Sequence, residues 1–241
     1  MLNFVFGDSH GTGEELERLI EPLAATHNLI SVGDLFDRAP HGVKVWELIQ
    51  KYNIKSTMGN HEAKMLDYLT GKREWLSSNY YSFLNEFSNN YNLQDLVDFL
   101  SSLPKIIKIN NTCLVTHAAV NLQNPWLEDK SINCFGKYPE NPKLNEGRRG
   151  WQEKYTKEVL VLYGHVTFPE VNFGYSKSGL INSIGLDTSA CHGNKLTGYS
   201  VEQNRFYSVK SKEDYFGKVR GLKLEPNTLV KEFVNNNGNK S

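Results

Sequence analysis

Short polar motifs rich in aspartate, histidine and asparagine recur along the chain. In order they are GDSHG (7–11), GDLFDR (33–38), GNHE (59–62), His117 and His165. Carboxylate, imidazole and amide groups bind divalent ions of intermediate hardness such as Mn, Fe, Zn, Co or Ni, whereas a set of thiolates would indicate structural zinc. The residue types therefore predict a site for divalent metal ions.

Each motif follows a short stretch that is typical of a β-strand. These stretches lie at 3–6, 29–32, 54–58, 112–116 and 159–163. Each is followed at once by glycine, aspartate, asparagine or histidine, so five predicted strands present polar residues at their C-terminal ends. A glycine directly before most of these polar residues allows a tight turn and a close approach of the backbone.

Helical patterns separate the early strands. Apolar residues recur at helical spacing over 14–25 and 42–52, which indicates an amphipathic helix in each segment. The alternation of strand and helix is typical of an α/β fold. Residues 62–103 depart from this alternation, because a long stretch rich in Leu, Phe, Tyr and Asn has helical spacing only, and we interpret it as a helical insertion.

Strand-like stretches after the last motif predict a second sheet. They lie at 180–186, 197–201 and 205–209. We therefore expect an α/β fold in which a two-sheet β-sandwich is flanked by helices. Residues 1–234 would form one domain, and residues 235–241 a flexible polar tail, because Asn, Gly, Lys and Ser alone offer no apolar surface to bury.

The composition argues against several classes of protein. The 241 residues include 27 basic and 27 acidic side chains, so no net charge favours nucleic acid. Cys113, Cys134 and Cys191 are an odd number without CxxC spacing, which argues against a disulfide framework and a thiolate zinc site. No apolar stretch approaches the roughly 20 residues of a membrane helix, and the short apolar run at 1–6 is unlike a secretory signal. We expect a cytoplasmic protein without membrane partners, with a phage gene as one source.

The ordered motifs resemble the signature of the calcineurin-like metallophosphoesterases, specifically of their phosphoprotein phosphatase branch. LPKIIKINNTCLVTHAAV (103–120) and GLDTSACHGNKLT (185–197) are similar to further segments of that family. The chain length is closer to compact phage and bacterial members, which include serine/threonine protein phosphatases and diadenosine tetraphosphate hydrolases. The resemblance implies the calcineurin-like metallophosphoesterase fold.

The resemblance also implies a centre of two divalent ions, with manganese as the first choice and Fe, Zn, Co or Ni as alternatives. The first ion would be bound by Asp8, His10 and Asp34. The second would be bound by Asp34, Asn60, His117 and His165. Asp34 would then bridge the pair, and a hydroxide shared by the two ions would attack phosphorus directly.

Further roles carry over from the family to matching positions. His61 would be the general acid for the leaving group, and Asp37 would orient its imidazole. The substrate phosphate would be contacted by Arg38, Asn60 and Arg148, with Arg149 as an alternative to the last. Arg38 suits this role because a guanidinium donates two parallel hydrogen bonds to phosphate oxygens.

Three functional hypotheses remain open from the sequence. The first is a metal-dependent phosphatase acting on phosphoserine or phosphothreonine in proteins. The alternative is a phosphohydrolase of diadenosine tetraphosphate or of another nucleotide or polynucleotide, which the same metal centre would serve. The third, a binding module that has lost catalysis, is disfavoured because every ligand position is retained. Substrate choice depends on loops that the motifs do not describe.

Several other polar and aromatic residues have structural explanations of similar or greater weight. Asp187 would orient a ligand or serve a turn, and His192 falls on no ligand position. Aromatic residues at helical spacing between Tyr80 and Tyr91 would form a platform for a substrate or, in our preferred interpretation, part of the core.

Overall fold

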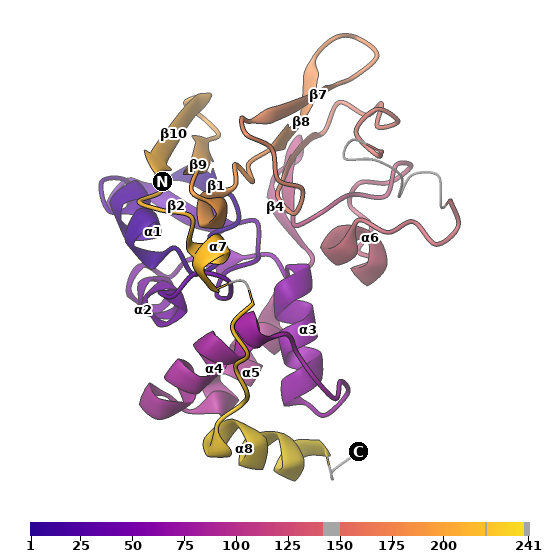
Figure 1. Cartoon of the computed structure of the whole chain (residues 1–241). Helices are drawn as coiled ribbons and strands as arrows, with labels where there is room; N and C mark the ends of the chain where they lie inside the picture. The colour runs from indigo at the N-terminus through magenta and orange to yellow at the C-terminus, as the bar shows by residue number, and fades with distance from the viewer. Residues whose placement is uncertain (142–149, 220, 239–241) are drawn as a thin grey trace.

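Two five-stranded sheets form the centre of the molecule (Figure 1). A computed structural model describes residues 1–141, 150–219 and 221–238 of the chain. The first sheet has the strand order β10-β9-β1-β2-β3, and the second has the order β4-β5-β6-β8-β7. This arrangement confirms the predicted two-sheet α/β fold.

The first sheet joins strands from the two ends of the chain. Its members are β1 (Leu2–Phe6), β2 (His27–Ser31), β3 (Lys55–Ser56), β9 (Lys195–Ser200) and β10 (Arg205–Lys210). The first three are parallel, with Phe6 opposite Ser31 in β1 and β2. β9 pairs antiparallel with β1 and β10. The parallel strands therefore end at the same edge of the sheet. The prediction that strands 197–201 and 205–209 belong to the second sheet is wrong, because both pair beside β1.

The second sheet repeats this plan. Its members are β4 (Ile106–Asn110), β5 (Cys113–Thr116), β6 (Leu160–Tyr163), β7 (Asn172–Tyr175) and β8 (Ile181–Gly185). β5, β6 and β8 are parallel neighbours, while β4 and β7 pair antiparallel at the edges. β7 is a strand that the sequence did not predict, because NFGY is short and contains a glycine.

A buried apolar layer lies between the two sheets. Val5 and Ile30 from the first sheet contact the same cluster as Val115, Leu162 and Ile184 from the second. The neighbours of Val5 along β1 belong to a different cluster, on the helix side of the sheet. Successive side chains of a strand point to opposite faces, so β1 is buried on both sides and its sequence is apolar throughout.

Helices cover the outer side of the first sheet and extend beyond it. α1 (Gly13–Ile20) and α2 (Gly42–Tyr52) contact one another and flank the sheet (Figure 1). α1 ends five residues before the predicted end at residue 25. Pro22 explains the early end, because proline has no N–H to donate to the carbonyl four residues earlier.

The predicted helical insertion is present as three helices. They are α3 (Asn60–Leu69), α4 (Ser78–Asn90) and α5 (Leu93–Ser102). α8 (Thr228–Gly238), from the end of the chain, contacts α3 and α4 and completes this layer (Figure 1). The structure thus differs from the prediction of a flexible tail from 235, since 235–238 form the last turn of α8.

Three short elements complete the described chain. They are α6 (Lys130–Phe135), the 3-10 turn η2 (Ala190–His192) and α7 (Tyr215–Val219). α7 contacts η2, which places both beside the first sheet. Within the described residues, no helix has the length and apolar character required to cross a bilayer.

Candidate metal centre and phosphate-binding site

The predicted polar residues meet where the parallel strands of both sheets end. Asp8 follows β1, Asp34 follows β2 and Asn60 opens α3 after β3. His117 and His165 follow β5 and β6 of the second sheet. Because parallel strands end at a common edge, and the two sheets pack face to face, residues up to 157 positions apart come into contact.

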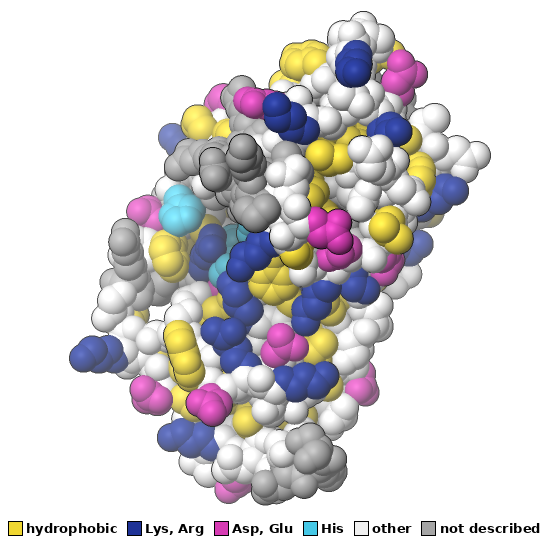
Figure 2. All heavy atoms as spheres, turned by 90° about the vertical axis from the view of Figure 1, so that its right-hand side faces the viewer, with side chains coloured by type: hydrophobic (Ala, Val, Ile, Leu, Met, Phe, Trp, Pro, Cys, Tyr) yellow, Lys and Arg dark blue, Asp and Glu magenta, His cyan; other side chains and the backbone are white. Residues whose placement is uncertain are grey.

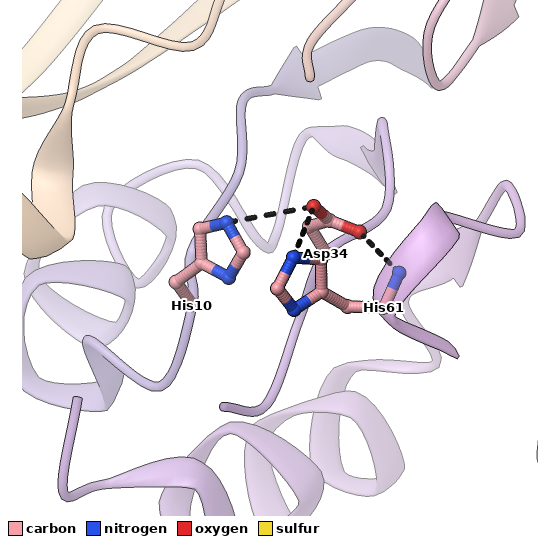
Figure 3. A group of neighbouring side chains, drawn as sticks. All are labelled: His10, Asp34 and His61. Carbon is pink, nitrogen blue, oxygen red and sulfur yellow. Dashed lines mark hydrogen bonds and ion pairs between the residues drawn. The ribbon is translucent and has the colours of Figure 1, made fainter. Parts of the chain in front are cut away.

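Asp34 lies at the centre of two groups of side chains that have the geometry to hold a metal ion. One group is His10, Asp34 and His61, and the other is Asp34, His117 and His165. Within each group the ligand atoms lie within 4.8 Å of one another. Figure 3 shows His10 and His61 turned toward the carboxylate of Asp34. A shared carboxylate between two such groups is the arrangement of a bridged pair of ions.

The two oxygens of Asp34 face different groups. Oδ2 lies 3.5 Å from Nε2 of His10 and 3.8 Å from Nε2 of His61 (Figure 3). Oδ1 lies 3.4 Å from Nε2 of His117 and accepts the backbone N–H of His61 at 3.0 Å. Burial is the largest single influence and raises the pKa of Asp34. The surrounding imidazoles together have a greater effect in the opposite direction, so the pKa of Asp34 lies below its ordinary value. Asp34 is therefore a carboxylate with both oxygens available as ligands.

Asn60 belongs to the second group. Its Oδ1 lies 3.0 Å from Nε2 of His117 and 2.9 Å from Nδ1 of His165. The other ring nitrogen of His117 lies 3.0 Å from the carbonyl oxygen of Val32, which accepts only, so Nδ1 carries the proton. Nε2 then directs a lone pair toward the oxygens of Asn60 and Asp34. Converging lone pairs repel one another, and a cation between them removes that repulsion.

Asp8 is adjacent to these groups but is not a member of either. Its carboxylate accepts the backbone N–H of His165 at 3.0 and 3.2 Å. Burial, followed by the charges of Asp187 and Asp34, raises the pKa of Asp8 well above its ordinary value. Three carboxyl groups thus crowd one buried region, and a divalent cation would favour their ionised forms.

The imidazoles are suited to act as ligands in their neutral form. Burial and the positive charge of Arg38 lower the pKa of His10 to about 4. Burial and the neighbouring His117 lower the pKa of His165 to about 3. A neutral imidazole keeps the lone pair that coordinates a metal ion. The donor set therefore fits divalent metal ions.

Four residues of the site have left-handed backbone conformations. The φ angle is +43° at His10, +54° at Asp34, +79° at Arg38 and +71° at His165. Residues other than glycine seldom adopt positive φ, and each instance costs about 1–3 kcal/mol. Such strain at four neighbouring functional positions indicates that the surrounding structure holds the ligands in place for a purpose other than stability.

The glycines and the glutamate of the motifs shape the backbone beneath the ligands. A Cβ atom on Gly59 would collide with Oδ1 of Asp34, and one on Gly164 would collide with Oδ1 of Asp8. Glu62 accepts the backbone N–H of Asp34 and that of Leu35, both at 2.8 Å. Glu62, the last residue of the GNHE motif, therefore fixes the loop that carries Asp34.

His61 is held at both ring nitrogens. Nδ1 lies 2.7 Å from Oδ2 of Asp37, and Nε2 lies 3.1 Å from Nη2 of Arg38. Nδ2 of Asn79, at the start of α4, donates to the same oxygen of Asp37. Burial is the largest single influence and lowers the pKa of His61, but the carboxylates of Asp34 and Asp37 more than compensate and raise it. The ring is thus oriented: because a guanidinium only donates, Nε2 accepts from Arg38, and Nδ1 carries the proton that Asp37 accepts.

A family model described as calcineurin-like phosphoesterase matches residues 4–209, which include every motif of the site. The chain belongs to the calcineurin-like phosphoesterases. Among its relatives, asymmetrical bis(5'-nucleosyl)-tetraphosphatase PrpE of Oceanobacillus iheyensis is 25% identical over 243 residues and covers 89% of this chain and 94% of its own. The protein of the same name from Bacillus cereus is 26% identical over 235 residues and covers 86% of this chain and 93% of its own.

Two solved structures share the phosphoesterase fold. A protein provisionally named as a diadenosine tetraphosphatase has a TM-score of 0.67 at 23% identity and covers 86% of this chain and 92% of its own. A metallophosphoesterase from Sphaerobacter thermophilus has a TM-score of 0.55 at 16% identity and covers 97% of this chain and 98% of its own. At these identities the likeness establishes the fold alone.

A pocket of about 290 Å³ adjoins the metal groups of this phosphoesterase. Its lining includes His61 together with three cationic side chains, Arg38, Lys64 and Arg73. Figure 2 shows Lys and Arg side chains gathered around a recess in which histidine is visible. Burial is the largest influence on the pKa of Lys64 and lowers it. Asp34 and Asp37 oppose this effect, whereas repulsion by Arg73 and Arg38 adds to it, and the pKa is lowered overall. Several positive charges thus share one small volume.

Sequence reasoning missed Lys64, Asn79 and the contact of Tyr80 with His61. The ring of Tyr80 stacks on His61 with centroids 5.3 Å apart and planes at 16°. Tyr80 also belongs to the buried core, as do the aromatic residues that follow it in α4, which confirms the preferred interpretation of the aromatic segment. No motif signalled these contacts, because they depend on how α4 packs against the loop after β2.

The remaining predicted residues lie at the margin of the site or outside the description. Arg148 and Arg149 fall within 142–149, outside the described residues. Asp187 is buried, and its Oδ1 accepts the backbone N–H of Ser189 at 3.0 Å. His192 is exposed, with its ring edge-on to Phe216.

Proposed function

We propose that this phosphoesterase hydrolyses dinucleoside tetraphosphates. The observation that carries the proposal is the pocket beside His61, whose lining includes the three cations Arg38, Lys64 and Arg73. A dinucleoside tetraphosphate carries several negative charges along one chain, and successive cations match it better than they match the single phosphate of a phosphoserine. The names of the relatives that span most of this chain support the same choice. Our initial preference for phosphoproteins has no comparable support.

The proposed metal ligands combine the two groups around Asp34 with the family resemblance, which assigns Asp8 to the first ion in place of His61. We assign Asp8, His10 and Asp34 to one ion, and Asp34, Asn60, His117 and His165 to the other. When bound, the two ions would lower the pKa of an attacking water and neutralise charge on the phosphoryl group. Manganese is our proposed native metal, because the oxygen and imidazole donors suit it. Our proposed location is the cytoplasm, where nucleotides occur.

The chain's own side chains would orient the phosphate and supply a proton. Arg38 presents a planar fork beside His61 and would hold two oxygens of the reacting phosphate. Once Arg38 turns its N–H groups from Nε2 of His61 to the phosphate, Nε2 would be free to take up a proton and donate it to the departing oxygen, while Asp37 accepts the hydrogen bond of Nδ1 and fixes the ring. Asn79 would keep Asp37 in that orientation through its own hydrogen bond.

A substrate comparison tests the proposal directly. Protein reconstituted with Mn is assayed with diadenosine tetraphosphate, a phosphoserine peptide, a phosphothreonine peptide and para-nitrophenyl phosphate, and nucleotide products are separated by anion exchange. We expect the highest kcat/KM for the dinucleotide, and ATP plus AMP as products if cleavage is asymmetrical. Two molecules of ADP would indicate symmetrical cleavage. A higher kcat/KM for the phosphopeptides would overturn the proposal in favour of a protein phosphatase.

A further inference from the structure

A tryptophan lies exposed at the mouth of the pocket. Trp75, in the loop between α3 and α4, has 63% of its surface exposed, whereas Trp46 and Trp151 are at most 6% exposed. Indole is a large apolar ring, so exposing it to water is unfavourable unless it contacts a partner for part of the time. Trp75 also lines the pocket beside His61 and is therefore next to the reaction centre.

Arg73 is held against this tryptophan. Its Nε donates to the carbonyl oxygen of Trp75 at 2.8 Å, and its guanidinium carbon lies 5.3 Å from the centre of the indole ring. Among the residues that the structure describes, Arg73 forms no ion pair with a carboxylate. The guanidinium is thus oriented by one hydrogen bond and one ring contact, and its other N–H groups remain available to an anion.

The ring of Tyr80 belongs to the same pocket. Tyr80 lines the pocket and is 3% exposed. Its ring stacks on His61, with centroids 5.3 Å apart. The wall of the pocket next to the site of reaction is therefore aromatic.

We propose that Arg73, Trp75 and Tyr80 form the subsite for the distal nucleotide of the substrate. A nucleobase would stack on the exposed indole, Arg73 would bind a phosphate near that nucleoside, and the ring of Tyr80 would form the wall between this subsite and His61. Stacking tolerates any base because every base has an aromatic face, so the subsite would select a nucleotide without selecting its identity. This inference rests on the proposed function and specifies how the same site recognises its substrate.

Kinetics of variants test the subsite. The measured quantity is the ratio of kcat/KM for diadenosine tetraphosphate to kcat/KM for para-nitrophenyl phosphate, which has no distal nucleotide. We expect this ratio to fall about tenfold in Trp75→Ala and in Arg73→Gln, through a higher KM for the dinucleotide. Trp75→Phe, which keeps an aromatic face, should recover most of the loss.

A matched control is available on β10, an edge strand of the first sheet. Arg205, at the start of β10, is exposed and its guanidinium lies 5.1 Å from the ring of Tyr207. Arg205→Gln removes the same charge from a similar arginine–aromatic pair outside the pocket. The substrate ratio of this variant should equal that of the unchanged protein.

Fluorescence provides a readout that does not depend on turnover. Stacking of a nucleobase on indole quenches its emission, so titration of the metal-free protein with diadenosine tetraphosphate should quench part of the tryptophan signal. Inorganic tripolyphosphate, which has the charge but no base, should produce little quenching. The response to the dinucleotide should disappear in Trp75→Phe.

The outcomes separate this inference from the proposed function. If the unchanged protein hydrolyses diadenosine tetraphosphate efficiently but Trp75→Ala and Arg73→Gln keep its substrate ratio, the distal subsite is wrong and the proposed function stands. If the protein prefers phosphopeptides, the proposed function fails. Equal quenching by tripolyphosphate would overturn the stacking role of Trp75.

Discussion

His61 occupies a position from which the geometry permits two roles. Its Nε2 lies 3.8 Å from Asp34, within a group that has the geometry of a metal site. The same ring is held by Asp37 and Arg38, which suits a group that transfers a proton to a phosphate ester. The two roles differ in one observable, because a metal ligand cannot be removed without weakening metal binding.

Replacing His61 decides between these roles. His61→Asn should lower kcat by about 10²–10⁴-fold, the usual contribution of a general acid, while two equivalents of metal stay bound. Metal content is measured by mass spectrometry of the dialysed protein, and turnover is measured in parallel. The exposed His192, changed to Asn, serves as the control. A drop to one bound ion in the His61 variant would assign His61 to the metal centre instead.

Asn79 is a positioning residue by the same reasoning. Its side chain donates to Asp37 and does not contact the metal groups, so its loss should disturb only the orientation of His61. We expect Asn79→Ala to lower kcat about tenfold, with metal content and KM nearly unchanged. Asn90→Ala, at the other end of α4, removes a hydrogen bond from Nδ2 to the backbone carbonyl of Glu86 and should leave kcat unaltered. A change confined to KM in Asn79→Ala would contradict the assignment.

At the scale of single residues, the sequence predicted the ordered motif positions but not their supports. Asp34 and His117 were identifiable because each follows a strand and carries a ligand atom. Asn79 and Trp75 were not, because their place beside the site arises from the packing of α4, and of the loop before it, against the loop after β2. A single sequence contains no local signal for such a contact.

At the scale of elements, periodicity located the buried strands and the larger helices. α8 was missed because its second half is rich in asparagine, yet Val230, Phe233 and Val234 have the spacing of one helix face and pack on the main core. The signal was therefore present but short. α6 and β7 have six and four residues, too few for a period to show.

Aromatic contacts join the helical insertion to α2 and to the loop after β2. Phe83 lies parallel to Phe36, with centroids 4.8 Å apart, and Phe87 meets Trp46 edge-on at 5.1 Å. Phe36 is in the loop that carries Asp34 and Asp37, so these contacts connect α4 with the site. The insertion therefore supports the loop as well as covering the sheet.

Phe87 tests the strength of this junction. It is completely buried, so Phe87→Ala should lower the free energy of unfolding by about 3–5 kcal/mol, from lost burial and the cavity left behind. Urea denaturation followed by circular dichroism measures the change. Phe206→Ala, at a position that is 36% exposed, is the control and should cost clearly less. Equal losses in both variants would show that the junction contributes no special stability.

At the scale of the whole molecule, the candidate ligands come from both sheets. Asp34 belongs to the first sheet, whereas His117 and His165 follow strands of the second. Metal ions bound there would cross-link the two halves of the sandwich. They would also neutralise the buried carboxylates, including Asp8, whose pKa is raised by burial and by Asp187 and Asp34. Both effects favour the folded state in the presence of metal.

Metal removal should therefore lower stability as well as activity. A ligand at about 100 times its Kd stabilises the native state by about 2.7 kcal/mol, which for a chain of this size corresponds to a rise in Tm of about 5–10 °C. Differential scanning calorimetry with Mn and with EDTA measures this shift. Asp34→Asn weakens both groups at once, so its Tm should respond little to Mn, and its activity should be nearly abolished. If two ions bind and Tm stays the same with and without EDTA, the sheets are held together by the apolar layer around Val5 and Ile184 alone.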